Sequence, residues 1–280
     1  MTKARENSDY TGLAADIVAG DTAARAGRKN LIINGRLGTN TMVNQRGFAS
    51  GTLNDGDYGF DRWLSASGAS VLALNADDVT LTSGKLMQWI EDPHIAGKQI
   101  TISAKVNSGT LTGRVGTGSI AFQTLPFTIT APSGNLRLEL VGNGSQFTNV
   151  QLELGSVATD FEHRSYGEIL ADCQRYFERF DYSGGGRSGL TGQCHSTSIM
   201  YGGFQFQPKR ATPSISTSTV GNFRIIHRGS ATNVSGLAFN ANSRCARVGV
   251  STGGGLTSGD AGCMDTDNDN GQYIDIDAEL

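Results

Sequence analysis

The sequence predicts a mainly β protein, and three observations lead to this prediction. Glycine is the outlier in the composition, with 38 of 280 residues. Short runs of alternating apolar and polar residues recur with turn residues between them, roughly every eight to twelve positions. Only one stretch has the three-and-four spacing of an amphipathic helix. We therefore predict an N-terminal arm (1–29), a jelly-roll β-sandwich (30–164), a connecting α-helix (165–180) and a second, smaller C-terminal β domain (181–280).

The low charge excludes several classes of partner. Charged residues make up 18% of the chain and the net charge is −3, so no polybasic surface is available for nucleic acid. No run approaches the roughly 20 apolar residues of a membrane span. The first ten residues, MTKARENSDY, lack the apolar core of a secretion signal. The sequence therefore predicts a soluble protein with no nucleic-acid partner and no membrane span.

The four cysteines do not form a recognisable metal or disulfide pattern. They are widely spaced and contain no C-x-x-C pair, at Cys173, Cys194, Cys245 and Cys263. We interpret them as mostly buried thiols. Adjacent residues on a strand point to opposite faces, so Cys194 and His195 are not expected to act as a nucleophile and its base.

The predicted arm is polar and rich in alanine. Leu13, Ile17 and Val18 have helical spacing, but an isolated helix of this length is marginal in water. The arm is expected to become ordered only against a partner or its own copies. A frayed terminus is the alternative interpretation.

The sandwich is predicted from about eight short strands separated by turns such as Asn34-Gly35. On one of these strands Leu136, Leu138 and Leu140 would share a buried face, while Arg137 and Glu139 point to solvent. Trp89 alternates with Met87 and is expected in the core. The predicted strands are Val71–Leu74, Val79–Leu81, Leu86–Ile90, Ile100–Val106, Ser119–Phe122, Phe127–Ile129, Leu136–Val141 and Val150–Leu154.

One aromatic stretch within this domain is a candidate glycan site. Sugar rings stack on aromatic faces, and carboxylate and guanidinium groups bind sugar hydroxyls. The side chains with this chemistry are Tyr58, Asp61, Arg62 and Trp63. The alternative is structural, with Trp63 in the core and Asp61 and Arg62 as a structural pair.

The connecting helix follows a half-buried strand in which Val150, Leu152 and Leu154 alternate with polar residues. Ser165 and Glu168 have the spacing of a capping box, so the helix should begin there. Its apolar face could form the axis of an oligomer, or could cover the base of the sandwich in a monomer. That face consists of Ile169, Leu170, Cys173, Tyr176, Phe177 and Phe180.

The sequence pattern of the C-terminal domain also predicts short strands joined by loops rich in Gly, Ser, Thr and Asn. Such loops suit hydrogen bonding to glycan hydroxyls, although they also suit an ordinary surface. The predicted strands are Ile199–Tyr201, Phe204–Phe206, Ile215–Thr217, Phe223–His227, Leu237–Phe239, Arg247–Val250 and Tyr273–Ile276.

A weak calcium motif precedes the last strand. Asp265, Asp267 and Asp269 place oxygens at positions one, three and five of a calcium loop. The glycine then comes one residue late, and Ile276 stands where a bidentate Glu is needed. We therefore predict no metal and no cofactor, with a solvated acidic turn at this place.

Searches for catalytic motifs find no G-x-S-x-G elbow, H-E-x-x-H pair, phosphate loop or dinucleotide fingerprint. Paired carboxylates are harder to dismiss, because two acidic groups in one cleft can cleave a glycosidic bond. The sequence predicts a protein that is not an enzyme.

Several segments resemble the non-enzymatic fibre and head-spike proteins of tailed bacteriophages and related particles. They are NLIINGRL (30–37), NQRG (44–47), FDRW (60–63), the stretch from QLELG to CQRYF (151–177) and IDIDAEL (274–280). The resemblance implies a carbohydrate-binding-like jelly roll, attachment to other virion proteins through the arm, and a homotrimer. It also implies a place on the virion surface after synthesis in the host cytoplasm.

Together these features predict a virion protein for host adhesion. It would bind host cell-surface polysaccharide as a receptor without cleaving it. Two alternatives remain open, a glycan depolymerase or deacetylase and a purely architectural decoration or connector protein.

Overall fold

The computed structural model describes residues 29–116, 120–182, 189–266 and 271–280. The predicted arm, apart from Lys29, lies outside the described residues. Internal contacts divide the chain into two compact units, Met1–Ile169 and Leu170–Leu280. We call them the first unit and the second unit and describe each by itself.

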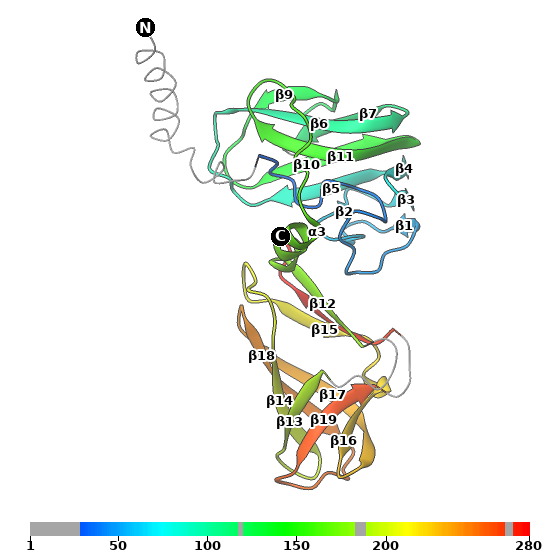
Figure 1. The fold of residues 1–280 in the computed structure, drawn as a ribbon, viewed down its shortest axis with the longest axis vertical. Coiled ribbons are helices and arrows are strands. Elements are labelled where there is room, and N and C mark those ends of the chain that lie inside the picture. Colours follow the sequence, from blue (N-terminus) through cyan, green and yellow to red (C-terminus); the bar gives the residue numbers. More distant parts are fainter. Residues whose placement is uncertain (1–28, 117–119, 183–188, 267–270) are drawn as a thin grey trace. The chain divides into compact units, whose positions relative to one another are not determined.

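The first unit is built from two antiparallel sheets (Figure 1). The six-stranded sheet has the order β1 (Gly51–Leu53), β3 (Ser70–Leu74), β4 (Val79–Ser83), β11 (Ser145–Leu154), β6 (Gln99–Ser108) and β9 (Phe127–Thr130). The five-stranded sheet has the order β2 (Leu64–Ser65), β5 (Lys85–Ile90), β10 (Leu136–Gly142), β7 (Leu111–Val115) and β8 (Gln123–Thr124). The prediction of a mainly β protein is confirmed.

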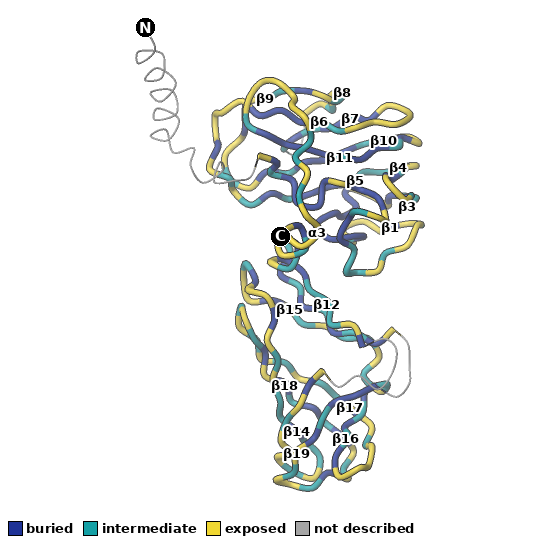
Figure 2. The backbone as a smooth tube through the Cα atoms, in the orientation of Figure 1, coloured by how far each residue is buried: buried dark blue, intermediate teal, exposed yellow. Residues whose placement is uncertain are grey.

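The core of the first unit lies between these sheets. Ile102 and Leu152 contribute from the six-stranded sheet, and Leu138 and Leu140 contribute from the five-stranded sheet, each fully buried. Figure 2 shows the buried positions running along the middle of the strands. Because successive strand residues point to opposite faces, the predicted alternation along β10 places its leucines in the core.

Two predictions about the outer face of the five-stranded sheet are wrong. Glu139 does not point to solvent, because Arg114 and Arg137 both turn their guanidinium groups onto its carboxylate and bury it completely. Trp89 is not in the core. It lies half-buried beside Arg137, whose guanidinium carbon is 5.7 Å from the ring centroid. A charged residue on an outward position is buried here because Arg114 faces it in register on β7 and Arg137 lies two residues earlier on β10.

The second unit contains a closed six-stranded barrel and a three-stranded sheet. The barrel order is β13 (Leu190–Cys194), β14 (Ile199–Gln205), β18 (Cys245–Thr252), β17 (Ser230–Ala241), β16 (Phe223–His227) and β19 (Ala261–Thr266). The small sheet has the order β12 (Phe177–Asp181), β20 (Tyr273–Asp277) and β15 (Ser214–Thr217), and a short turn of 3-10 helix, η1 (Val220–Asn222), precedes β16.

The interior of the barrel is filled by side chains. Met200, Val248 and Ile225 are fully buried and point inward from three different strands. A Cβ atom at Gly262 would lie 2.9 Å from the sulfur of Met200, so a larger residue there would require the methionine side chain to shift. The barrel is therefore a packed core, and ligand-binding surface is left to its outside.

The helix α3 spans Tyr166–Gln174, and its predicted start is confirmed. The Ser165 amide donates to the Glu168 carboxylate at 2.9 Å, and the Glu168 amide donates back to the Ser165 hydroxyl at 3.4 Å. This reciprocal pair is the predicted capping box.

The predicted end of the helix at Phe180 is wrong. Phe177 and Phe180 lie on β12, which pairs with β20. The stretch Phe-Glu-Arg-Phe-Asp also alternates with period two, and pairing with β20 gives it a full ladder of backbone hydrogen bonds. The ladder is reinforced by an ion pair of 2.6 Å between Arg179 and Asp275. Tertiary pairing therefore overrides a spacing that also fits a helix.

The apolar residues predicted for an oligomer axis are already covered within one chain. Ile169, Cys173, Tyr176 and Phe177 are each less than 9% exposed, and Leu170 and Phe180 are half-buried. They do not form a free apolar stripe. Within the described residues, no helix is long and apolar enough to cross a membrane.

Replacing Leu138 by Ala should lower the free energy of unfolding of the first unit by about 2–5 kcal/mol, because the side chain is fully buried between the sheets. Both tryptophans of the chain, Trp63 and Trp89, lie in the first unit, so fluorescence during urea denaturation reports on this unit alone. Val157→Ala is the control, because that side chain is 70% exposed and its loss should change stability by less than about 0.5 kcal/mol. Equal effects of the two substitutions would contradict the assigned core.

Candidate functional site

The glycan site predicted in the first unit lies in the core. Trp63 is fully buried and its ring nitrogen donates to the Asn34 carbonyl at 2.9 Å. The Asp61 carboxylate accepts from the backbone amide of Gln45 at 2.6 Å and from its side-chain amide at 2.8 Å. Burial raises the pKa of Asp61, although these hydrogen bonds act in the opposite direction.

The other two members of that set are also engaged within the chain. Arg62 is 1% exposed and donates to the Trp89 carbonyl. Tyr58 is half-buried, with the guanidinium carbon of Arg46 4.7 Å from its ring centroid. The geometry supports the structural interpretation of this motif, because three of its four side chains expose almost no surface to a ligand.

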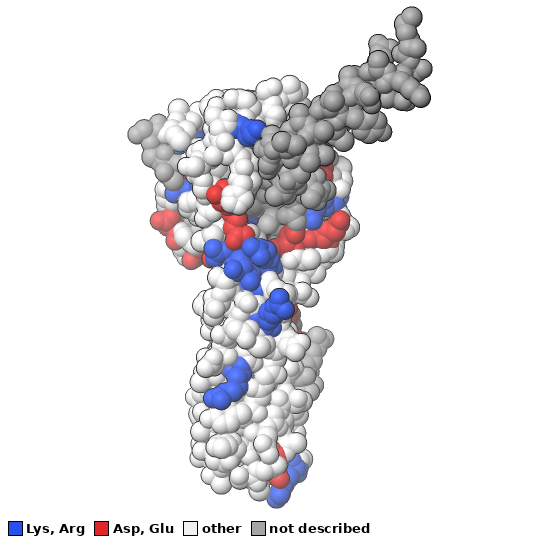
Figure 3. Space-filling model, turned by 90° about the vertical axis from the view of Figure 1, so that its left-hand side faces the viewer, with Lys and Arg blue, Asp and Glu red and all other residues white. Residues whose placement is uncertain are grey.

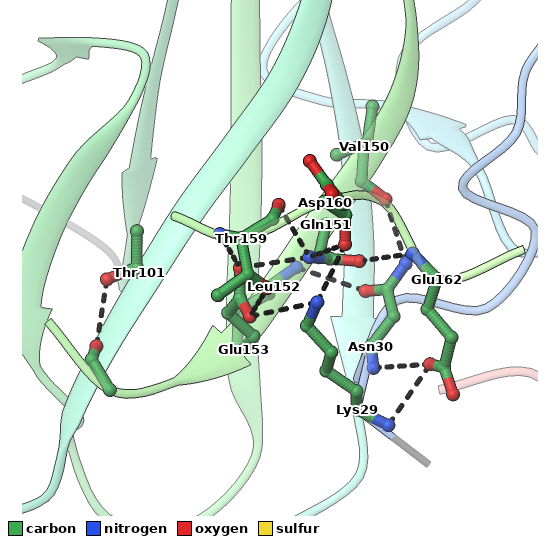
Figure 4. A network of polar contacts seen from close by, with 11 residues as sticks. Lys29, Asn30, Thr101, Val150, Gln151, Leu152, Glu153, Thr159, Asp160 and Glu162 are labelled. Carbon is green, nitrogen blue, oxygen red and sulfur yellow. Dashed lines mark hydrogen bonds and ion pairs between the residues drawn. The ribbon is translucent and has the colours of Figure 1, made fainter. Parts of the chain in front are cut away.

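The motifs near residue 30 and in β11 meet in one polar network (Figure 4). The Asn30 side chain donates to the Val150 carbonyl at 3.0 Å and accepts from the Leu152 amide at 3.1 Å. The carboxylate of Glu162 accepts from the backbone amides of Lys29 and Asn30. The network thus fixes the start of the described chain against the central strand of the larger sheet.

Glu153 is the buried charge of this network. Its carboxylate accepts from the amide and the hydroxyl of Thr159 and from the side-chain amide of Gln151. Burial by itself raises the pKa of Glu153, but these hydrogen bonds, helped by the nearby Lys29 ammonium, outweigh it and lower the pKa below 4.5. The predicted half-buried strand is therefore wrong at Gln151 and Glu153, because the segment after β11 covers its polar face.

Acid should weaken the first unit partly through Glu153. Its pKa is lowered on folding, so the ionised carboxylate stabilises the fold above its ordinary pKa of 4.5, and this contribution is lost as the pH falls through the folded value. The substitution Glu153→Gln keeps the shape of the side chain but removes its ionisable carboxyl group. The difference in unfolding free energy between the natural protein and this variant should shrink between about pH 6 and pH 3.

The matched control for this experiment is Asp55→Asn, at an exposed carboxylate in a turn. The difference in unfolding free energy between Asp55→Asn and the natural protein should change little over the same pH range. A Glu153→Gln difference that is independent of pH would contradict the role assigned to this carboxylate.

The weak calcium motif is only partly described, because Asp267 and Asp269 lie outside the described residues. Asp265 is buried on β19, where its carboxylate accepts from the Thr266 amide at 2.7 Å and pairs with Arg224 at 3.3 Å. Among the described residues, no cluster of three or more His, Cys, Asp or Glu side chains could hold a metal ion.

An open groove of about 410 Å³ lies on the outside of the barrel, over β14 and β18. We call it the β14–β18 groove. Gly203 leaves the outer face of β14 without a side chain at the floor of the groove, and Arg247 lies opposite it on the neighbouring strand. The residues lining it are Gly202, Gly203, Phe204, Gln205, Cys245, Ala246 and Arg247.

An aromatic and cationic pair borders this groove. The guanidinium carbon of Arg247 lies 4.6 Å from the centroid of the Tyr201 ring. In register, Tyr201 faces Gly249 and Arg247 faces Gly203, so each long side chain has a glycine opposite it. A Cβ atom at Gly249 would lie 3.3 Å from the Tyr201 ring, which shows that the ring lies down over this glycine. Glycine on both strands thus lets the ring and the guanidinium meet diagonally across the sheet.

Hydrogen-bonding groups surround the pair. Gln193 is opposite Tyr201 in register on β13, and Gln205 lies further along β14, and both are exposed. The His195 ring is exposed with its centroid 5.3 Å from that of Tyr201. The preceding Cys194 is fully buried while His195 is exposed, so the two side chains point apart as the sequence predicted. Burial also raises the pKa of the Cys194 thiol.

A second hollow on the barrel, of about 580 Å³, differs from the groove in that its arginine is already paired with a carboxylate. It lies over β13, β16 and β19, and Ile226, Ala261 and Cys263 are among its lining. Its cation, Arg228, is already paired with the Asp260 carboxylate, with a nitrogen-to-oxygen distance of 3.1 Å. The β14–β18 groove is therefore the better candidate for binding.

No protein-family model matches this chain, and a search of curated proteins found no match.

The sequence predictions missed Tyr201 and Arg247 as a pair. The available signal is the repeat of a long side chain followed two residues later by glycine, in Tyr201-Gly202-Gly203 and in Arg247-Val248-Gly249. This spacing places the long side chain and the glycine on the same face of each strand. The antiparallel register that sets the two pairs against each other was not visible in the sequence.

Proposed function

We propose that this chain is a fibre-type or spike-type protein of a phage or phage-like particle and that it adheres to host cell-surface polysaccharide through the β14–β18 groove. The observation that carries the proposal is the open groove with Gly203 at its floor and Arg247 in its lining, where the guanidinium carbon of Arg247 lies 4.6 Å from the centroid of the neighbouring Tyr201 ring. The particle context rests on the resemblance of the sequence segments described above.

The chemistry of the groove suits a carbohydrate. Polysaccharides present many hydroxyl groups and flat apolar ring faces, which amide side chains and aromatic rings bind respectively. Gln193, Gln205 and Tyr201 supply these groups on neighbouring strands. An open groove can also bind an internal segment of a long polysaccharide chain, whereas an enclosed pocket holds only a small molecule or a chain end.

Binding without cleavage is part of the proposal. Hydrolysis of a glycosidic bond ordinarily requires two carboxyl groups that flank it. Among the described residues that line the groove, none is acidic. This composition supports an adhesive role for the groove.

The first unit serves as a scaffold in this proposal. Its two packed sheets would form a jelly roll resembling carbohydrate-binding modules, and its shared motifs would maintain that fold. Asp61 and Trp63 are buried in it, and hydrogen bonds of Asn30 and Glu162 hold the first described residues against β11. Residues before Lys29 would then attach the protein to other virion proteins.

A homotrimer would strengthen adhesion by avidity. Linking several weak sites can raise the overall affinity about 10²–10⁴-fold without any new contact. We expect light scattering at micromolar concentration to give three times the mass of the chain, which is 29.5 kDa. A mass equal to one chain would contradict the trimer.

Tyr201→Ala should weaken binding of the full chain to capsular polysaccharide by about tenfold or more, since it removes the aromatic ring beside the groove and the contact that orients Arg247. Tyr58→Ala, at the site predicted from sequence in the first unit, should leave binding unchanged. Surface plasmon resonance on immobilised capsule measures both affinities, and adsorption to capsulated and capsule-deficient cells tests the natural protein.

Three outcomes separate the alternatives for this protein. Loss of binding in Tyr58→Ala, with Tyr201→Ala unaffected, would place the site in the first unit and contradict the assigned groove. Release of reducing ends or acetate from capsule would establish the enzyme alternative. Normal assembly with no binding to any glycan or cell would establish a purely architectural role.

A further inference from the structure

We propose that the β14–β18 groove selects acidic polysaccharides, with the Arg247 guanidinium binding a carboxylate on the sugar chain. This inference rests on the proposed function and names the class of glycan for that site. It follows from how the charges of the second unit are paired.

Most arginines whose contacts are described in the barrel and its neighbouring sheet are neutralised by a carboxylate. Arg224 on β16 pairs with Asp265, and Arg179 on β12 pairs with Asp275. Arg228, in the turn after β16, pairs with Asp260. Arg247 and Arg244 have no carboxylate among the described residues within ion-pair distance, and of these two only Arg247 contacts an aromatic ring, that of Tyr201.

The ring orients the guanidinium without neutralising it. A guanidinium stacked on an aromatic ring is held through its flat face, which leaves its hydrogen-bond donors at the edge available. Arg247 is exposed, so these donors reach solvent. The guanidinium is thus preorganised, and a ligand that binds it does not have to order a flexible side chain.

The space beside Arg247 suits a planar anion. Gly203 faces it on β14 and has no side chain to occupy the groove, while Asn240 faces it on β17 and supplies an amide. A carboxylate matches the fork of a guanidinium with two parallel hydrogen bonds. Sugar hydroxyls next to that carboxylate would then reach Asn240 or Gln205.

The surroundings carry little charge that would compete with such a ligand. In the view of Figure 3 the surface of the second unit is mostly uncharged, and its basic residues form a few separate patches. An unpaired cation in such a surface attracts an acidic sugar at low ionic strength, and added salt screens this attraction. The groove should therefore bind acidic glycans more weakly as the salt concentration rises.

The test uses pairs of polysaccharides that differ only in charge. Polygalacturonate, alginate, hyaluronan and acidic capsule preparations are each compared with a carboxyl-reduced form, in which the acid has become a primary alcohol. The natural full chain should bind the acidic member of at least one pair about tenfold or more tightly than its reduced form. Arg247→Gln should bind both members with the same, lower affinity.

Arg244→Gln is the matched control. It removes the same charge from an exposed arginine three positions away that does not line the groove, and it should keep the preference for the acidic form. Thermal unfolding of each variant checks that the fold is kept. A sulfated glycan included in the panel tests the ligand chemistry, because the planar carboxylate should bind more tightly than a sulfate ester on a similar chain.

The outcomes distinguish this inference from the proposed function. Equal binding of acidic and reduced forms by the natural protein would overturn the charge selection while leaving polysaccharide adhesion in place. A preference that survives in Arg247→Gln would also overturn it. Binding to no member of any pair, and to no capsule, would overturn the proposed function itself.

Discussion

The alternation of side chains along paired strands is the constraint on which the rest of this structure depends. In the barrel, every strand must hydrogen-bond to two neighbours, so each residue points either into the core or out to solvent. Met200, Val248 and Val250 fill the interior. Their neighbours Tyr201, Arg247 and Gly249 are therefore on the outside, at positions fixed by the same register. The candidate site is a consequence of how the core is packed.

Much of the fold could be predicted from the sequence because apolar periodicity reports directly on burial. The strand Phe223–His227 was predicted with its observed bounds, and the capping box of Ser165 and Glu168 gave the start of the helix. The end of the helix was not predictable in the same way. Phe177 and Phe180 fit both a helical and a strand spacing, and pairing with β20, about 100 residues later in the chain, decides between them.

Polar residues account for most of the other differences. Glu139, Gln151 and Glu153 were expected at the surface or on a half-buried strand, yet each is almost fully buried. Sequence periodicity cannot show that a partner such as Arg114 or a following segment will cover a polar face. The same reason explains why Asp61 and Trp63 looked like a sugar site. Their chemistry suits a ligand, but the chain itself supplies the partners.

The central claim is that the β14–β18 groove, and not the first unit, contacts the polysaccharide. The most direct measurement is hydrogen exchange of the full chain with and without capsular polysaccharide, because it locates contact without any substitution. Our account predicts slower exchange in peptides containing Gly202–Gln205 and Cys245–Arg247, with unchanged exchange around Tyr58–Trp63. Slower exchange confined to the first unit would contradict it.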